Sequence, residues 1–221
     1  MKKTLNLVVL GPSGSGKGTQ AGLLAEKFGL EHIEVGDMLR ELARQSTSLG
    51  RKIDRIINKR GKFIPAELTI NIIRLRIQSL LKKQGIVFDG SPRKLIEAKT
   101  LDNLLSKLNR KIDKVFLLDI SEIESVERLV KRRVCRKCDA NFAIGLNIIK
   151  NQIRCPKCGG KLYQRKDDTR ERILARLREY RKETLSVANY YCRKCKLVII
   201  NGEQSIKKVH QDIIDELKGL I

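Results

Sequence analysis

The amino-acid sequence predicts an α/β fold in which helices cover both faces of a parallel sheet. Short, continuous apolar runs alternate with longer segments of helical periodicity along the 221 residues, as in chains whose parallel strands are buried on both faces. The first apolar run leads directly into a glycine-rich loop at 11–20, and a helical pattern follows that loop. The length suits one domain with small inserts, and it allows a substantial core.

The expected strands are the apolar runs, which are too short for helices and are rich in Val, Ile, Leu and Phe. They lie at 5–10, 32–35, 86–88, 115–120 and 197–200. The expected helices begin after Lys17, near Asp37, after Ala66, at Lys94 and after Ser121. Two later helical patterns are preceded by capping-box pairs, Ser121 with Glu124 and Asp168 with Glu171.

Two regions interrupt the alternation of strands and helices. Residues 36–64 are helical and charged and lie between the second and third strands, whereas residues 131–168 carry glycine and cysteine. We expect both regions to be small inserts on one core domain, which is built from residues 1–35, 65–130 and 169–221.

The composition is that of a globular protein, with 41% hydrophobic and 33% charged residues. No apolar run approaches the roughly 18 residues that a membrane span requires, so no membrane partner is expected. The apolar part of the N-terminal segment, residues 5–10, is short for a signal peptide and is not followed by a small-residue cleavage site. We therefore expect this segment to be the first strand of a cytoplasmic protein.

The chain is strongly basic. Lys and Arg number 47 against 25 Asp and Glu, which gives a formal net charge of +22 and favours anionic partners such as nucleotides. The basic residues are spread along the chain, and aromatic residues make up only 4%. A stacking surface for nucleic acid is therefore not supported, and no specific nucleic-acid partner is expected.

The segment GPSGSGKGTQ at 11–20 has the spacing of a phosphate-binding loop. Its glycines let backbone N–H groups point at phosphate oxygens, the following helix adds the positive end of its dipole, and Lys17 reaches the outer phosphates. Gly18 stands where a magnesium-binding Ser or Thr usually follows the lysine. We therefore expect Asp89 and Asp37 to hold Mg²⁺ through its water molecules.

The cysteines predict a metal site. The pattern C-x2-C-x16-C-x2-C joins Cys135, Cys138, Cys155 and Cys158, and this spacing brings four thiolates to one tetrahedral Zn²⁺ of structural type. A thiol redox pair is the alternative. A third pair, Cys192 and Cys195, offers only two ligands. Free surface thiols, a metal shared between subunits and a redox pair all remain open for it.

Six segments together resemble adenylate kinases over nearly all of residues 4–221. They are GPSGSGKGTQ (11–20), GDMLR (36–40), DGSPR (89–93), RRVCRKC (132–138), QRKDD (164–168) and ARLREY (175–180). The resemblance implies a P-loop NTPase fold with a five-stranded parallel sheet, a helical insert (36–64) that binds a nucleoside monophosphate, and a zinc-bearing lid (131–168). It also implies phosphoryl transfer from Mg²⁺-bound ATP to AMP, giving two ADP, in a monomer, with an oligomer as the alternative.

The resemblance further implies roles for individual residues. The catalytic set is Lys17, Arg93, Arg128, Arg132, Arg165 and Arg176. The expected ATP-binding residues are Gly14, Ser15, Gly16, Lys17, Gly18, Thr19, Arg128, Arg132 and Gln204. The expected AMP-binding residues are Val35, Arg40, Lys62, Phe63, Ile64, Gly90, Arg93, Glu97, Arg165 and Arg176. From their spacing, Arg128 and Arg132 would share one helix face, as would Arg165 and Arg176 if the chain between them is helical.

Three residues depart from the pattern of the family at the acceptor base. Glu97 replaces a usual Gln, Val35 a usual Thr and Ser91 a usual Phe. An ionised carboxylate only accepts hydrogen bonds, whereas an amide also donates them, so Glu97 would suit a base edge with two donors, such as guanine. A relaxed or altered preference (GMP, CMP or UMP) is therefore the alternative to AMP. Alternatives of other kinds are a basic zinc-ribbon protein that binds RNA and a plain ATPase. No general base is needed, and His32 and His210 are expected to be structural.

Overall fold

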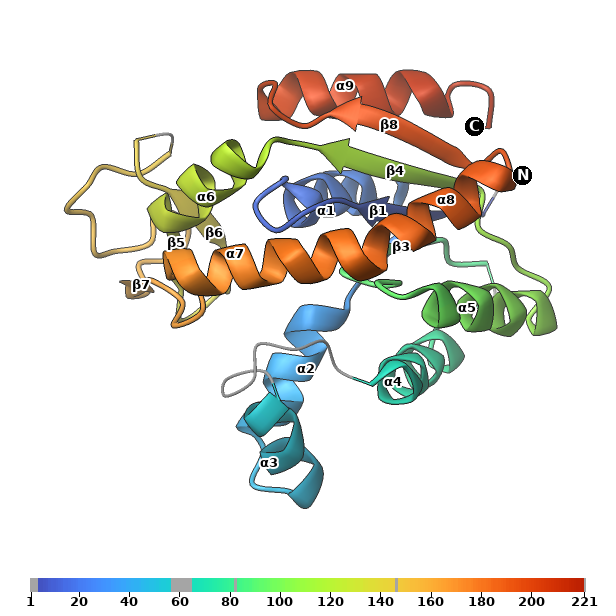
Figure 1. Ribbon diagram of the computed structural model, residues 1–221, viewed down its shortest axis with the longest axis horizontal. Coiled ribbons are helices and arrows are strands. Elements are labelled where there is room, and N and C mark those ends of the chain that lie inside the picture. Colours follow the sequence, from blue (N-terminus) through green and yellow to red (C-terminus); the bar gives the residue numbers. More distant parts are fainter. Residues whose placement is uncertain (1–3, 57–64, 82, 146, 221) are drawn as a thin grey trace.

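The computed structural model describes residues 4–56, 65–81, 83–145 and 147–220. These residues form a central five-stranded parallel sheet in the order β2-β3-β1-β4-β8 (Figure 1). The strands are β1 (Asn6–Leu10), β2 (Glu31–Glu34), β3 (Ile86–Asp89), β4 (Lys114–Asp119) and β8 (Leu197–Asn201). The predicted α/β fold with a parallel five-stranded sheet is therefore confirmed.

Helices cover both faces of this sheet. One face carries α1 (Lys17–Phe28) and α9 (Ile206–Leu217). The other carries α4 (Ala66–Gln78), α5 (Leu95–Lys107) and α8 (Leu185–Arg193). Within the described parts of the chain, none of the helices has the length and apolar character needed to cross a membrane.

The two faces have separate cores because successive strand residues point to opposite sides of a sheet. Leu7 and Val9 of β1 belong to the cluster beneath α1 and α9, whereas Val8 and Leu10 belong to the cluster beneath α4, α5 and α8. All four side chains are buried. Each burial stabilises the fold by about 1.5–3 kcal/mol, so the sheet is a rigid base for the loops at its carboxyl edge.

Two helices, α2 (Val35–Arg44) and α3 (Ser48–Asp54), project away from the sheet after β2 (Figure 1). The predicted strand at 32–35 is displaced by one residue, because Val35 already begins α2 and is buried there. Residues 57–64 of the predicted insert lie outside the described residues.

A second, smaller sheet forms within the cysteine-bearing region. Its strands are antiparallel, in the order β6-β5-β7, with bounds β5 (Arg132–Cys135), β6 (Asn141–Ala143) and β7 (Leu162–Tyr163). Helix α6 (Glu122–Lys131) leads into this small sheet, and α7 (Arg170–Glu179) leads away from it. Its buried apolar cluster contains only Cys135, Ile148, Cys155 and Leu162 among the described residues, so packing alone gives it little stability.

One nearly continuous helix connects the small sheet with the main sheet. It consists of α7, a π-helical turn η2 (Tyr180–Thr184) and α8, and it crosses the molecule in Figure 1. Thr184 of the π-helical turn is buried, and its hydroxyl donates a 3.1 Å hydrogen bond to the carbonyl of Arg93. Turns of this type occur frequently at functional sites.

Of the two predicted capping boxes, one forms in part, because the backbone N–H of Ser121 donates to Glu203 instead of Glu124. Ser121 is the N-cap of α6, and its hydroxyl accepts a hydrogen bond from the amide of Glu124. The prediction at Asp168 was wrong, because the N-cap of α7 is Thr169, which makes no side-chain cap bond. The carboxylate of Asp168 instead binds the guanidinium of Arg132, and a charged donor is a stronger partner than a helix amide.

Candidate active site

The glycine-rich loop connects β1 to α1 and presents the start of that helix to a cavity. Gly14 and Gly16 adopt positive φ angles of 87° and 88°, which glycine tolerates without steric cost. Gly16 is the N-cap of α1 and supplies no side-chain hydrogen bond. Ser15 is buried, and its hydroxyl has no hydrogen-bond partner in the described structure. An uncapped helix N-terminus with an unsatisfied hydroxyl beside it is suited to an anion.

Lys17 is the first residue of α1 and lies against the same loop. Its ammonium donates a 2.7 Å hydrogen bond to the carbonyl of Pro12. Burial lowers the pKa of Lys17 to about 8; the charge of Asp89 opposes this shift, and those of Arg93 and Arg132 add to it. A phosphate group bound next to Lys17 would favour the charged ammonium and reverse this shift.

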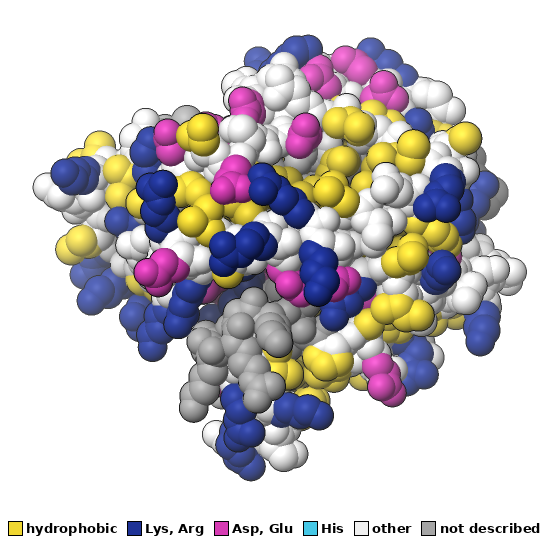
Figure 2. Space-filling model, viewed as in Figure 1, with side chains coloured by type: hydrophobic (Ala, Val, Ile, Leu, Met, Phe, Trp, Pro, Cys, Tyr) yellow, Lys and Arg dark blue, Asp and Glu magenta, His cyan; other side chains and the backbone are white. Residues whose placement is uncertain are grey.

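A cavity of about 1690 Å³ lies between the loop, the carboxyl ends of β2 and β3, α2, α6, α7 and the small sheet. A pocket for one ordinary ligand has roughly 300–1,000 Å³, so this cavity has room for two nucleotide-sized molecules. On the outer surface, Lys and Arg side chains are spread over the visible face rather than gathered in one patch (Figure 2).

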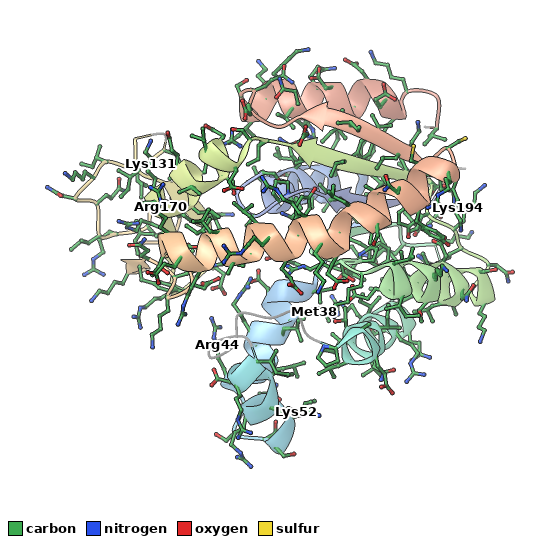
Figure 3. All side chains as sticks on the ribbon, in the orientation of Figure 1. Met38, Arg44, Lys52, Lys131, Arg170 and Lys194 are labelled. Atoms are coloured by element: carbon green, nitrogen blue, oxygen red, sulfur yellow. The ribbon has the colours of Figure 1, made fainter. Side chains whose placement is uncertain are left out.

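All six arginines that the sequence singled out line this cavity: Arg40, Arg93, Arg128, Arg132, Arg165 and Arg176. Their predicted placement on shared helix faces was wrong for two of them. Arg132 follows the end of α6 and begins β5, and Arg165 precedes the start of α7. Both lie next to the small sheet, in the region where Figure 3 labels Lys131, the last residue of α6, and Arg170, the first residue of α7.

Carboxylates hold several of these arginines. Arg132 donates two hydrogen bonds to Asp168, of 2.8 and 2.7 Å. Arg176 donates to the same carboxylate at 3.0 Å and to Asp167 at 2.7 Å. The side chain of Asp168 is 0% exposed. Asp167 and Asp168 belong to the QRKDD segment but were not predicted as site residues. The two carboxylates next to an arginine in that segment could have indicated that they bind arginines.

Arg165 lies among like charges. Its pKa is lowered by burial and by the charges of Arg40 and Arg132, and its Nε is buried with no hydrogen-bond partner in the described chain. A cluster of guanidinium groups with an unsatisfied N–H attracts a multiply charged anion.

The predicted magnesium residues lie at the carboxyl edge of the sheet. Asp89 is buried at the end of β3, and Asp37 in the first turn of α2 contacts Arg40. A Cβ placed on Gly18 would lie 3.1 Å from Oδ2 of Asp89. Glycine at position 18 therefore leaves room for the Asp89 carboxylate.

Glu34 ends β2 beside these carboxylates and was not predicted as a site residue. Burial raises its pKa to about 7, and the negative charge of Asp89 adds to this shift. Arg40 donates a 3.2 Å hydrogen bond to it. Its position at the carboxyl end of a parallel strand, where ligands bind in such sheets, was the available signal.

The residues predicted to hold the acceptor base belong in part to the same cavity. Val35, Gly90 and Glu97 line it, whereas Lys62, Phe63 and Ile64 lie outside the described residues. Glu97 is 2% exposed, and one carboxylate oxygen accepts the backbone N–H of Arg93 at 2.7 Å and the hydroxyl of Ser91 at 3.4 Å. Burial raises the pKa of Glu97, and the Arg93 hydrogen bond only partly opposes this.

Gln204 and Thr19 were predicted on the ATP side, and both line the cavity. The Gln204 amide donates to the carbonyl of Asn201 at 3.0 Å and to the carboxylate of Asp212 at 2.9 Å. These bonds orient the side chain at the start of α9.

The four cysteines of the small sheet have the geometry of a zinc site. The sulfurs of Cys135, Cys138, Cys155 and Cys158 all lie within 4.8 Å of one another, with pairs at 3.4 and 3.8 Å. Four Zn–S bonds of about 2.3 Å in a tetrahedron separate the sulfurs by about 3.8 Å. A Cβ on Gly160 would lie 2.8 Å from the sulfur of Cys135, so glycine is needed there. The set is therefore compatible with Zn²⁺.

Cys192 and Cys195 lie apart from that cluster, at the end of α8, and both are exposed. Neither belongs to any group of three or more potential metal ligands among the described residues. The three interpretations given for this pair therefore remain open.

Comparison with known proteins gives one consistent family. The family model described as adenylate kinase matches residues 9–196. The chain is 41% identical over 209 residues to an adenylate kinase of Archaeoglobus fulgidus, covering 95% of this chain and 96% of that one. It is 40% identical over 216 residues to that of a Geobacillus species, with 98% and 100% covered. An adenylate kinase of Methanothrix thermoacetophila is 40% identical over 209 residues, with 95% and 96% covered.

These matches extend over the phosphate loop, the cavity arginines and the cysteine cluster alike, and they favour a phosphotransferase over the RNA-binding alternative. Taken with the parallel sheet and the large cavity at its carboxyl edge, they lead to one assignment: this chain belongs to the adenylate kinase family.

Proposed function

We propose that the chain transfers the terminal phosphoryl group of Mg²⁺-bound ATP to AMP and so forms two ADP. The observation that carries this proposal is a single cavity lined by the uncapped loop and helix start, by acceptor-side residues and by arginines from several elements. Phosphoryl transfer needs in-line positioning and positive charge rather than a general base. The arginines supply the charge, and binding both nucleotides in one cavity would position them.

On the donor side, the amides of residues 14–19 and the ammonium of Lys17 would hold the ATP phosphates, with Arg128 and Arg132 over the transferring group. Arg128 is fixed for this by hydrogen bonds to Glu124 at 2.6 Å and to the carbonyl of Gly202 at 3.0 Å. Bound Mg²⁺, held through water by Asp37 and Asp89, would supply charge neutralisation on the phosphate oxygens.

On the acceptor side, Arg40 and Arg93 would bind the phosphate of AMP, and Arg165 and Arg176 would face both nucleotides. An oxygen of the AMP phosphate then attacks the terminal phosphorus of ATP. A new P–O bond forms as the bond to the bridging oxygen breaks, and that oxygen leaves as part of ADP. Because carboxylates hold several arginines in the nucleotide-free protein, the guanidinium groups are positioned before substrate arrives, which lowers the cost of ordering them.

We further propose that residues 36–64 form the acceptor-binding insert and residues 131–168 a zinc-stiffened lid on the core domain, formed by residues 1–35, 65–130 and 169–221. Closure of the lid would exclude water, so that ATP is not hydrolysed in place of transfer. The small buried cluster of the cysteine region supports a structural task for Zn²⁺ there.

The base of the acceptor nucleotide is the remaining choice, and we propose that the protonation state of Glu97 selects it. A protonated Glu97 resembles the Gln usual in the family, because its O–H donates to adenine N1 while its carbonyl accepts from the 6-amino group. The raised pKa of Glu97 favours this form and therefore AMP. An ionised Glu97 would instead favour guanine, so GMP is the second candidate.

Coupled-assay rates with AMP, GMP, CMP and UMP, measured at successive pH values upward from the ordinary glutamate pKa of 4.5, distinguish these two states. We expect AMP to be preferred, and its advantage over GMP to shrink as the pH rises. Glu97→Gln should restore a pH-independent preference for AMP. A parent preference for AMP that does not change with pH or with this substitution would show that Glu97 does not select the base.

Arg176→Ala tests the phosphate-binding role. Loss of one donor to a developing charge costs about 10²–10³ in kcat. The matched control is Arg178→Ala, since Arg178 is an exposed arginine of α7 that does not line the cavity. Equal rates for both variants would contradict the proposed function.

A further inference from the structure

Strands β2 and β3 place three potential metal ligands on one face of the sheet. His32 and Glu34 are two residues apart in β2, so their side chains point to the same side. Glu34 is the register partner of Asp89 in the neighbouring parallel strand β3. The fold therefore brings an imidazole and two carboxylates together at the carboxyl edge, beside the phosphate loop.

The distances within this group, which we call the His32 cluster, are those of a metal site. One ligand atom from each of His32, Glu34 and Asp89 lies within 4.8 Å of the others. Nε2 of His32 is 3.7 Å from Oδ2 of Asp89. Metal–nitrogen and metal–oxygen bonds of about 2.0–2.2 Å set ligand atoms about 3–4 Å apart, so a small contraction would let all three bind one ion.

The imidazole nitrogen provides an independent observation. Nε2 of His32 is buried and makes no hydrogen bond in the described structure; its neighbour Oδ2 of Asp89, at 3.7 Å, would pair with it only if the imidazole is protonated. A buried polar atom without a partner is costly, and a metal ion bound between the three side chains would satisfy it. The sequence predicted only a structural role for His32, yet its side chain lines the large cavity.

Three cationic side chains lie near the His32 cluster, and each already has a hydrogen-bond partner. Arg40 donates a 3.2 Å hydrogen bond to Oε1 of Glu34, and the carboxyl group of Asp37 also contacts Glu34. The Lys17 ammonium is held by the carbonyl of Pro12, and Arg93 by that of Gly90 at 2.7 Å.

We propose that His32, Glu34 and Asp89 form a second metal site that binds a divalent transition-metal ion directly and without nucleotide. One nitrogen and two oxygen ligands suit Mn²⁺, Co²⁺ or Zn²⁺ better than Mg²⁺, which prefers oxygen ligands and retains its water molecules. The site differs from the cysteine cluster in position and ligands. It shares Asp89 with the proposed Mg²⁺ position but differs from it in its other ligands, because binding is through the side chains themselves and needs no ATP.

The test is a titration of the zinc-replete, nucleotide-free protein with Co²⁺, followed by visible absorption. We expect one further equivalent to bind with the spectrum of nitrogen and oxygen ligation and without thiolate charge transfer, which would report replacement of zinc. His32→Asn should weaken this binding more than about 100-fold and Glu34→Gln by about 10–100-fold, since changes even to supporting residues cost that much. Zinc content and the melting temperature of each variant verify that it has folded.

Two matched controls lie in the same chain. His210→Gln removes the only other histidine, and Glu31→Gln removes a carboxylate of β2 that binds Arg76 at 2.8 Å and is outside the His32 cluster. Both should leave Co²⁺ affinity unchanged.

A variant-free measurement completes the test. Substoichiometric Mn²⁺ should broaden the imidazole proton signals of His32 and not those of His210. Absence of Co²⁺ binding beyond the zinc site, equal affinity of the parent and both cluster variants, binding only in the presence of ATP, or equal broadening of both histidines would each overturn the proposal.

Discussion

Replacing Asp168 by Asn tests whether one buried carboxylate holds two cavity arginines in place. The Asp168 side chain is 0% exposed, and it accepts two hydrogen bonds from Arg132 and one from Arg176. Asparagine keeps the shape but removes the negative charge and one acceptor oxygen. The Arg132 side chain, only 19% exposed, would then lack the charge that balances it, and Arg176, equally exposed, would keep only Asp167.

The expected loss can be estimated from this geometry. Breaking a buried ion pair from one side costs about 3–5 kcal/mol, because a buried charge is left uncompensated. Arg176 keeps its bond to Asp167, and both arginines touch solvent, so we expect about 3 kcal/mol. For a chain of this size each kcal/mol lowers the melting temperature by about 2–4 °C. The melting temperature should therefore fall by about 6–12 °C.

The assay is thermal and urea unfolding of the nucleotide-free protein, with Asp139→Asn as the control. Asp139 is 49% exposed, and its ion pair with Arg44 is 3.8 Å long, so its loss should change the free energy of unfolding by less than about 0.5 kcal/mol. If Asp168→Asn differs from Asp139→Asn by less than 1 kcal/mol, the buried carboxylate does not organise the arginines as inferred.

Three further changes probe the loop, the acceptor end and the cysteine cluster. Gly11→Ala should destabilise the protein by about 2 kcal/mol in urea unfolding, because its Cβ would lie 2.5 Å from the carbonyl oxygen of Leu118. Gly22 lies within a helix and has open space around it, so Gly22→Ala should stabilise the protein by about 0.5–1 kcal/mol. Equal effects of the two substitutions would refute the steric reason. The folded-state pKa of Glu97 is raised by burial. The stability that this shift contributes is therefore fully present below the ordinary pKa of 4.5 and is lost as pH rises through the raised value. The free energy of unfolding of the parent relative to Glu97→Gln should fall across that window, and a constant difference would contradict this. Cys158→Ser should abolish zinc binding by elemental analysis and remove hydrogen-exchange protection from the small sheet while the main sheet stays protected; full zinc content in the variant would rule out four-thiolate ligation.

The main sheet could be predicted because four of its five strands contain a continuous apolar run, and burial within the fold leaves that signal in the sequence. Strand β2 (Glu31–Glu34) is the exception, since Ile33 is its only buried residue, and its predicted bounds were displaced by one residue. The strands of the small sheet, such as β7 (Leu162–Tyr163), are too short to show any period. In this region only the cysteines could be interpreted from the sequence, because the spacing of metal ligands does not depend on secondary structure.

The sequence predicted which arginines line the site, but not which carboxylates bind them. The arginines were identified from motif positions, and they do line one cavity. Helical spacing placed Arg132 and Arg165 incorrectly because both lie just beyond helix ends. The carboxylate partner Asp168 was taken for a helix cap, since its local pattern fits one; only the tertiary approach of Arg132 reveals its actual bond.

The long helix through α7, η2 and α8 has a mechanical consequence. It carries Arg176 near the cysteine region and, two turns later, the Thr184 hydroxyl that fixes the backbone of Arg93. One helix thus reaches from the cysteine region to the backbone of Arg93. Under the proposed function, a tilt of this helix would displace Arg176 and Arg93 together, so that the binding of the two nucleotides would change together.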